Sequence, residues 1–153
     1  MAARIAPEGG WPPLQQKTAR PDKARKPPRE RGRQEDAAHL ALIRKLPSLL
    51  GGDGPVEAAH IRMSDAAFGK RNPGIGQKPD DAWVTPLSVE KHREQHAEGN
   101  ERWFWERHGI NPLLVAQQLY GVSVALRASN AAEEDIVRAM TNIVLKARKE
   151  AGL

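Results

Sequence analysis

Two of the five histidines lie four residues apart, in the segment Lys91-His-Arg-Glu-Gln-His96. On a helix, positions i and i+4 share one face, so the imidazoles of His92 and His96 could bind one divalent metal ion. The same spacing also occurs where two solvated histidines lie on a polar helix. The pair alone is therefore a weak indication of a metal site.

A third histidine, His60, lies near the end of a short apolar segment, residues 56–61, which is typical of a β-strand. An imidazole at the end of a strand that faces a helical histidine pair can take a proton from water while the pair holds a metal. By itself, His60 could equally be a buried, hydrogen-bonded core histidine. The order of His60, His92 and His96 favours a functional site over a core histidine.

The surrounding sequence predicts the elements that must position these side chains. An apolar repeat with helical spacing follows Asp36, a good N-cap, and ends before Pro47. Ser88 is a good N-cap for the helix that would carry His92 and His96. Further segments complete the expectation: strands at 56–61 and 82–87, and helices at 89–98, 100–107, 111–125 and 130–149. The predicted fold class is α+β.

The positive charge is concentrated near the N-terminus. The formal net charge is +5, and residues 1–35 hold nine basic and four acidic residues, so residues 36–153 are neutral. Residues 1–35 also hold six of the twelve prolines and few aliphatic side chains. We expect a disordered basic arm over 1–35 and a folded domain over 36–153. The arm could neutralise DNA phosphates, or it could be a solubilising leader.

Composition excludes several classes of function. The chain contains no cysteine, which excludes a disulfide framework, thiolate catalysis and cysteine-based zinc or iron–sulfur sites. No apolar stretch is long enough for a transmembrane helix, and no secretory signal is recognisable. We therefore expect a soluble cytoplasmic protein without a membrane partner.

Five segments, in this order, resemble the HNH-superfamily nucleases of the phage recombination-enhancement (Ref) type and related prophage proteins. They are Val56-Glu-Ala-Ala-His-Ile-Arg62, Gly74-Ile-Gly-Gln-Lys-Pro-Asp-Asp81, Trp83-Val-Thr-Pro-Leu87, His92-Arg-Glu-Gln-His96 and Trp105-Glu-Arg-His-Gly-Ile-Asn-Pro112. The resemblance covers about 46–114. It implies a small ββα-metal (HNH, or His-Me finger) core with additional packing helices, and metal-dependent cleavage of DNA. It also implies a bacterial, nucleoid-associated location and a recombinase filament as a further partner.

The resemblance assigns roles to individual residues. His60 corresponds to the general base, and His92 and His96 correspond to the metal ligands. Asp80 or Asp81 stands near the position whose side chain orients the base histidine. Basic residues around these positions are expected to contact phosphates, with an ordinary solvated surface as the alternative: Arg62, Lys70, Arg71, Lys78 and Arg93.

The chain departs from the family pattern at the structural zinc knuckle. The four ligand positions hold residues that cannot replace cysteine at this spacing: Ser48, Gly51, Ser88 and Lys91. We therefore predict that no structural zinc binds, and that packing replaces it through Leu46, Leu49, Leu50 and Leu87. Ala59, before the base histidine, cannot ligate a metal either. The metal would then have two imidazole ligands, with water and phosphate completing its coordination, unless Glu57 or an aspartate also binds it. Such a site suits Mg²⁺ or Mn²⁺, although Zn²⁺ or Ni²⁺ also bind histidine-rich sites.

The remaining aromatic and histidine residues suggest structural roles. Trp103, Phe104 and Trp105 are expected in the core, with base stacking as the alternative. His39 and His108 belong to no constellation and are expected to be structural or exposed. The leading hypothesis is a phage-type DNA endonuclease. The alternatives are a catalytically inactive DNA-binding or recombinase-accessory protein on the same fold, and a structural phage protein whose arm binds packaged DNA.

Overall fold

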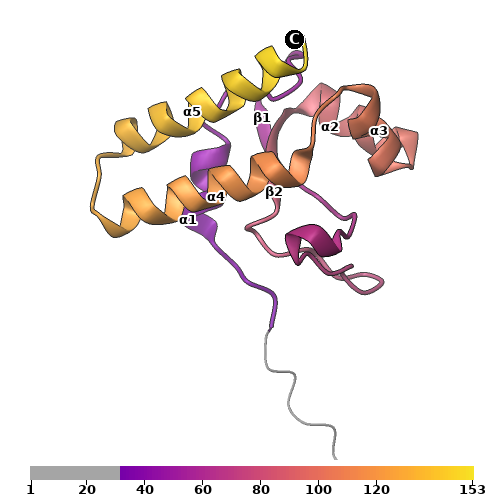
Figure 1. Cartoon of the computed structure of the whole chain (residues 1–153), viewed down its shortest axis with the longest axis horizontal. Coiled ribbons are helices and arrows are strands. Elements are labelled where there is room, and N and C mark those ends of the chain that lie inside the picture. Colours follow the sequence, from indigo (N-terminus) through magenta and orange to yellow (C-terminus); the bar gives the residue numbers. More distant parts are fainter. Residues whose placement is uncertain (1–31) are drawn as a thin grey trace, which may run out of the picture. The chain divides into compact units, whose positions relative to one another are not determined.

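Residues 32–153 are described by the computed structural model, and they form five α-helices and one two-stranded antiparallel sheet (Figure 1). The α+β class is therefore confirmed. Most of the predicted arm lies outside the described residues. The elements follow in this order: α1 (Ala37–Ile43), β1 (Val56–His60), a 3-10 turn η1 (Ala66–Phe68), β2 (Val84–Ser88), α2 (Val89–Glu98), α3 (Glu101–Arg107), α4 (Pro112–Ala128) and α5 (Glu133–Glu150).

The sheet and α2 form a continuous ββα unit. β1 and β2 pair antiparallel, with Val56 opposite Ser88 and His60 opposite Val84. α2 follows β2 without a loop, because the Ser88 hydroxyl accepts a hydrogen bond from the Lys91 N–H at 3.3 Å and caps the helix. α2 packs against both strands. The bounds of this helix agree with those expected from the sequence.

Side-chain caps also begin α1 and α4. The Asp36 carboxylate accepts a hydrogen bond from the His39 N–H at 2.9 Å, and Asn111 caps α4 with Pro112 in its first turn. α5 begins at Glu133, three residues later than expected. The backbone of Asn130 has φ of 56°, in the left-handed region, so Asn130 lies in the turn between α4 and α5 and not in the helix.

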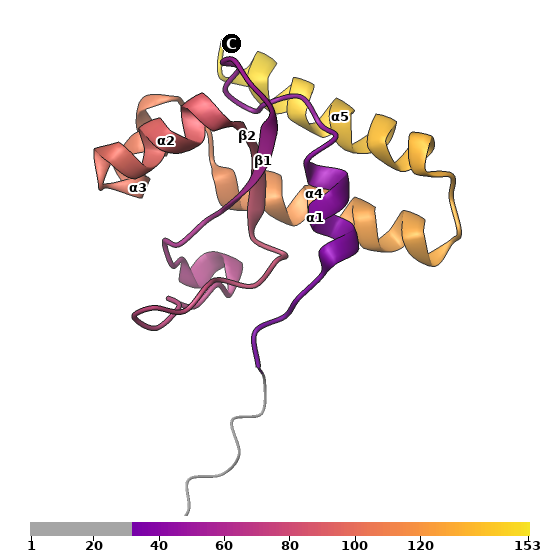
Figure 2. The ribbon, with the colours of Figure 1, turned by 180° about the vertical axis from the view of Figure 1, so that it is seen from behind.

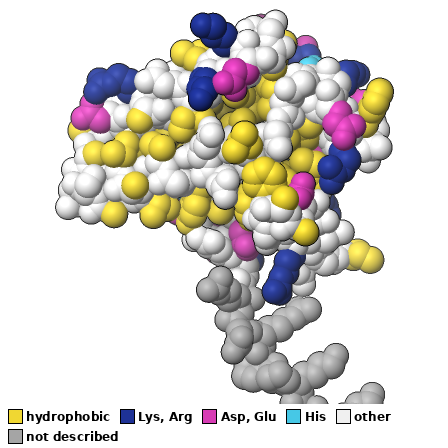
Figure 3. Space-filling model, viewed as in Figure 1, with side chains coloured by type: hydrophobic (Ala, Val, Ile, Leu, Met, Phe, Trp, Pro, Cys, Tyr) yellow, Lys and Arg dark blue, Asp and Glu magenta, His cyan; other side chains and the backbone are white. Residues whose placement is uncertain are grey.

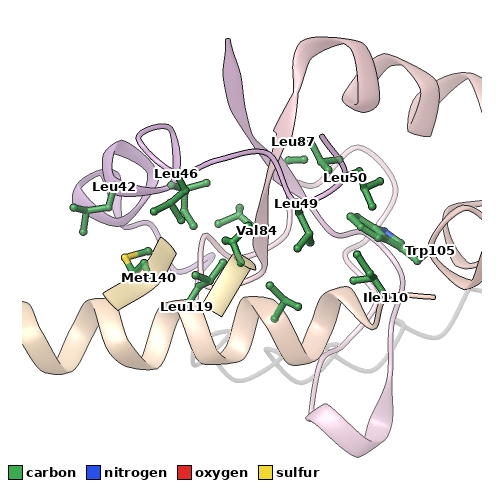
Figure 4. Packing of buried hydrophobic residues seen from close by; sticks show 14 of the residues in the cluster. Leu42, Leu46, Leu49, Leu50, Val84, Leu87, Trp105, Ile110, Leu119 and Met140 are labelled. Atoms are coloured by element: carbon green, nitrogen blue, oxygen red, sulfur yellow. The ribbon is translucent and has the colours of Figure 1, made fainter. Parts of the chain in front are cut away.

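The main core lies where the hairpin, the loop after α1 and the two long helices meet. α4 and α5 lie side by side in both views (Figures 1 and 2). Figure 4 shows Leu119 and Met140 from these helices close to Val84 of β2 and to the leucines of the loop after α1. The four leucines expected to replace the zinc knuckle are all buried: Leu46, Leu49, Leu50 and Leu87. Burying one such side chain contributes about 1.5–3 kcal/mol.

The aromatic cluster of α3 divides between core and surface. Phe104 and Trp105 are buried, as expected, whereas 56% of Trp103 is exposed. The expectation that all three side chains pack in the core is therefore wrong for Trp103. Consecutive residues of a helix point about 100° apart, so three adjacent side chains cannot share one buried face.

Apolar side chains also reach the surface on the two long helices. Figure 3 shows them along the face that α4 and α5 form in this view. Leu114 and Val124 of α4 and Leu145 of α5 are among the exposed large apolar residues. Within the described part of the chain, no helix combines the length and apolar character needed to cross a membrane.

Candidate functional site

His60 and Asp81 form a hydrogen-bonded pair at the end of the hairpin where the loop connects β1 to β2. His60 is the last residue of β1, and Asp81 lies three residues before β2 begins. His60 Nε2 lies 2.8 Å from Asp81 Oδ1. The neighbouring Asp80 carboxylate instead accepts a hydrogen bond from the Gln34 N–H at 2.8 Å. Of the two aspartates considered from the sequence, Asp81 is the one that contacts His60.

The surroundings of Asp81 hold its carboxylate in the ionised form. Asp81 is 2% exposed. Burial by itself raises the pKa of this carboxyl, but hydrogen bonds from the Asp36 N–H, from His60 and from the Arg33 guanidinium outweigh it, so the pKa lies below its ordinary value. An ionised carboxylate only accepts hydrogen bonds, so the shared proton belongs on His60 Nε2. The other ring nitrogen, Nδ1, is then free to accept a proton.

His92 and His96 form a second pair on α2. Their Nε2 atoms lie 3.1 Å apart, and their ring centroids lie 4.7 Å apart. Two nitrogen ligands at about 2.0–2.1 Å from one metal ion lie roughly 2.8–3.4 Å from each other at octahedral or tetrahedral angles. The spacing and the donor type of this pair therefore fit a single divalent metal.

Glu57 determines which nitrogen of His92 faces His96. Glu57 Oε2, on β1, lies 2.6 Å from His92 Nδ1. A carboxylate on one ring nitrogen of a metal-binding histidine fixes the ring and leaves the other nitrogen as the ligand. Glu57 thus contacts the nitrogen of His92 that points away from His96. The described residues contain no cluster of three or more His, Cys, Asp or Glu side chains arranged to hold an ion.

Two polar contacts join α2 and α3 to β1 and to the residues just after it. One is the Glu57–His92 contact. The other is the Glu101 carboxylate at the start of α3, which accepts hydrogen bonds from the N–H groups of Arg62 at 2.9 Å and Met63 at 2.7 Å, just beyond β1. Neither helix histidine is hydrogen bonded to His60 among the described residues. The structure therefore brings the predicted residues together as two pairs, one at the hairpin end and one on α2.

One of the basic residues predicted to contact phosphates cannot do so here. Lys70 is 5% exposed, and its ammonium group donates hydrogen bonds to the backbone carbonyls of Met63, at 2.7 Å, and Arg62. Burial lowers the pKa of Lys70. The prediction for Lys70 is wrong because this ammonium group stabilises a local turn. The other four predicted residues are exposed: Arg62, Arg71, Lys78 and Arg93.

The four positions that the resemblance assigns to a zinc knuckle do converge, and hydrogen bonds connect them. The Ser48 hydroxyl donates to the Gly51 carbonyl at 2.6 Å and accepts from the Ser88 N–H at 3.0 Å. The Ser88 hydroxyl donates to the same carbonyl at 2.9 Å, and it caps α2 through Lys91. A Cβ added at Gly52, where φ is 86°, would lie 2.6 Å from the Ser88 Oγ. Hydrogen-bonded and closely packed serine hydroxyls therefore occupy this region, next to the buried leucines.

Arg33 is a site residue that sequence reasoning missed. Its Nε donates to the Pro79 carbonyl at 2.9 Å, and its guanidinium forms an ion pair with Asp81. The Gln34 carbonyl also accepts a hydrogen bond from the Asp81 N–H at 2.9 Å. The folded part therefore begins earlier than the boundary expected at residue 36. Composition placed these residues in the arm because polar contacts to distant residues leave no local pattern.

Comparisons with known proteins found no match: no family model, no curated protein and no solved structure matches this chain.

Proposed function

We propose that this chain is a metal-dependent DNA endonuclease that hydrolyses phosphodiester bonds, associated with phage or prophage recombination. The observation that carries the proposal is the His60–Asp81 pair, in which an ionised, buried carboxylate contacts His60 Nε2 at 2.8 Å. The resemblance of residues 46–114 to HNH nucleases supports it. A recombinase filament is the further partner that this resemblance suggests.

His60 would act as the general base. Its Nδ1 accepts a proton from a water molecule, and the water oxygen attacks the scissile phosphorus as the bond to the leaving oxygen breaks. Asp81 holds the imidazole in the required orientation and stabilises the positive charge that it gains, as a carboxylate does in other histidine-based sites. Arg33 and the Asp36 N–H hold Asp81 in place.

His92 and His96 would hold the metal through their Nε2 atoms, with Glu57 fixing His92. A bound divalent metal supplies positive charge for the phosphate and the leaving oxygen. With two imidazole ligands, water and substrate oxygens would complete the coordination. This donor set suits Mg²⁺ or Mn²⁺, and Zn²⁺ or Ni²⁺ are the alternatives.

Plasmid cleavage tests the proposal directly. Purified full-length protein with Mg²⁺ or Mn²⁺ should convert supercoiled plasmid to open-circular or linear DNA, and EDTA should stop it. His60→Ala should lower the rate by at least about a hundredfold. Arg138→Ala, a change of an exposed side chain on α5, is the matched control. Equal cleavage by wild type and His60→Ala would reject the assignment of His60.

The second candidate is a catalytically inactive DNA-binding or recombinase-accessory protein. Two observations favour it. Ala59 cannot ligate a metal, and His60 is hydrogen bonded to Asp81 and not to His92 or His96. Calorimetry with DNA present distinguishes the two candidates. Metal binding together with cleavage supports the endonuclease, whereas salt-sensitive DNA binding without metal binding supports the accessory protein.

A further inference from the structure

The loop between η1 and β2 presents one apolar side chain at its apex. The Gln77 N–H donates to the Gly74 carbonyl at 2.9 Å, which closes a four-residue turn with Ile75 and Gly76 in its centre. Gly76 has φ of 75°, as the third residue of a type II turn requires. The Ile75 side chain is fully exposed. A hydrogen-bonded turn thus holds an isoleucine where it has nothing to pack against in the described part of the chain.

Positive charge surrounds this apex. Residues 69–79 contain two lysines and one arginine and no acidic residue. Lys70 is used internally, whereas Arg71 and Lys78 are exposed on the two sides of the turn. Neither forms an ion pair with another described residue. An apolar tip between two cations without ion-pair partners suits a ligand that has negative charges on its outside and apolar surface inside, as stacked bases between phosphate backbones have.

Both ends of the loop are anchored at the candidate site. At the start, Lys70 pairs with Asp65 in a β-bridge and its ammonium group binds the backbone just after His60. At the end, the Pro79 carbonyl and Asp81 contact Arg33, and Asp81 contacts His60. In both views the loop projects from the sheet, away from α5 (Figures 1 and 2). Asp81 is six positions after Ile75 in the chain, so the apex lies within about 20 Å of that residue.

We propose that this loop is a DNA wedge: Ile75 inserts between two base pairs from the minor groove of duplex DNA, while Arg71 and Lys78 contact the flanking phosphates. Exposed isoleucine, leucine and methionine side chains serve in this way in proteins that kink DNA. The inference rests on the proposed function, and it specifies the substrate as duplex DNA unstacked close to the scissile phosphate. A protein partner for Ile75 is the competing class, and the charge of the loop favours DNA.

Base unstacking in the absence of metal tests the wedge. The probe is a duplex of about 30 base pairs that carries 2-aminopurine at T–A steps, which unstack easily. With full-length protein in EDTA, 2-aminopurine fluorescence should rise on binding. Ile75→Ala should bind about tenfold more weakly and give no rise at saturation, whereas Ile75→Met should retain the rise. Leu114→Ala, which shortens an exposed side chain on α4, should behave as wild type.

The salt dependence of binding tests the flanking cations. Arg71→Gln and Lys78→Gln should each reduce the slope of log affinity against log salt concentration by about 1. Ile75→Ala should leave the slope unchanged, because it removes no phosphate contact. Unchanged slopes in both cation variants would overturn the placement of the loop against DNA.

Each result separates the wedge from the proposed nuclease. No fluorescence rise with wild type, or equal rises with wild type and Ile75→Ala, overturns the wedge and leaves Ile75 to a protein partner. A rise that depends on Ile75 without cleavage in Mn²⁺ retains the wedge and rejects the endonuclease. Cleavage in Mn²⁺ without any rise in EDTA retains the endonuclease and rejects the wedge.

Discussion

His60 and Arg33 bind the same carboxylate oxygen, Oδ1 of Asp81. The contact joins the end of a β-strand to a segment that precedes the first helix. The other oxygen of Asp81 accepts a hydrogen bond from the Asp36 N–H at 2.9 Å. A buried carboxylate with three donors has one orientation, and that orientation determines how the His60 ring lies.

The adjacent aspartates provide a matched pair of variants. Asp81→Asn should lower the plasmid cleavage rate by about a hundredfold or more, because an amide neither stabilises the charged imidazole nor enforces its tautomer. Asp80→Asn should retain most of the rate, since its carboxylate contacts the Gln34 N–H and not His60. Initial rates in Mn²⁺ measure both. Equal losses in the two variants would contradict the role given to Asp81.

Glu57 should affect metal affinity more than protein stability. Glu57→Ala should weaken Mn²⁺ binding about 10–100-fold, because His92 loses the carboxylate that orients it. The midpoint of urea unfolding should change little, since Glu57 is exposed. Isothermal titration with DNA present gives the affinity, and Glu106→Ala on α3 is the control. Unchanged Mn²⁺ affinity in Glu57→Ala would place the metal elsewhere.

His39 should make the protein less stable in mild acid. The ring is buried and lies nearly perpendicular to the Tyr120 ring, and neither ring nitrogen has a hydrogen-bond partner. Burial lowers the pKa of His39 from 6.5 to about 4, with the Arg127 charge also lowering it and Asp36 and Asp81 opposing the shift. The unfolded chain therefore binds more protons at this residue between pH 6.5 and 4.

The free energy of unfolding therefore has its full value above pH 6.5. It decreases as the pH falls toward 4, by a total on the order of 3 kcal/mol, because His39 must stay neutral in the folded protein. His39→Phe should retain the ring contact and remove the loss in this pH window. It should also raise the free energy of unfolding at pH 7 by about 1 kcal/mol or more, because two unpartnered polar atoms leave the core. Urea unfolding at a series of pH values measures this. Parallel pH profiles for wild type and His39→Phe would contradict the prediction.

The serine network should contribute to stability without any metal. Ser88→Ala should lower the free energy of unfolding by about 1–2 kcal/mol, because it removes both the cap of α2 and a hydrogen bond to the Gly51 carbonyl. EDTA should leave the melting temperatures of wild type and variant unchanged. Ser129→Ala, at the end of α4, is the control. Zinc that stays tightly bound at one ion per chain in His92→Ala, or a fall in the melting temperature of that variant with EDTA, would contradict it.

Local signals in the sequence determined most of the element bounds. Ser88, Asn111 and Asp36 are caps whose side chains bond backbone N–H groups two or three residues away, so a single sequence reveals them. The i, i+4 spacing of His92 and His96 likewise requires only that α2 is a helix. The Nε2 distance of 3.1 Å follows from that local geometry together with Glu57.

Only the tertiary structure decided which of these residues act together. The choice of Asp81 over Asp80, the contact of Arg33 with Asp81 and the burial of Lys70 depend on contacts between distant segments or across a folded turn. Such contacts leave no periodic pattern in the sequence, because a single ion pair or a single carbonyl acceptor is enough to position each side chain. The serine network is similar: the four positions could be named from the sequence, but the hydrogen bonds that join Ser48 to Ser88 required the folded loop.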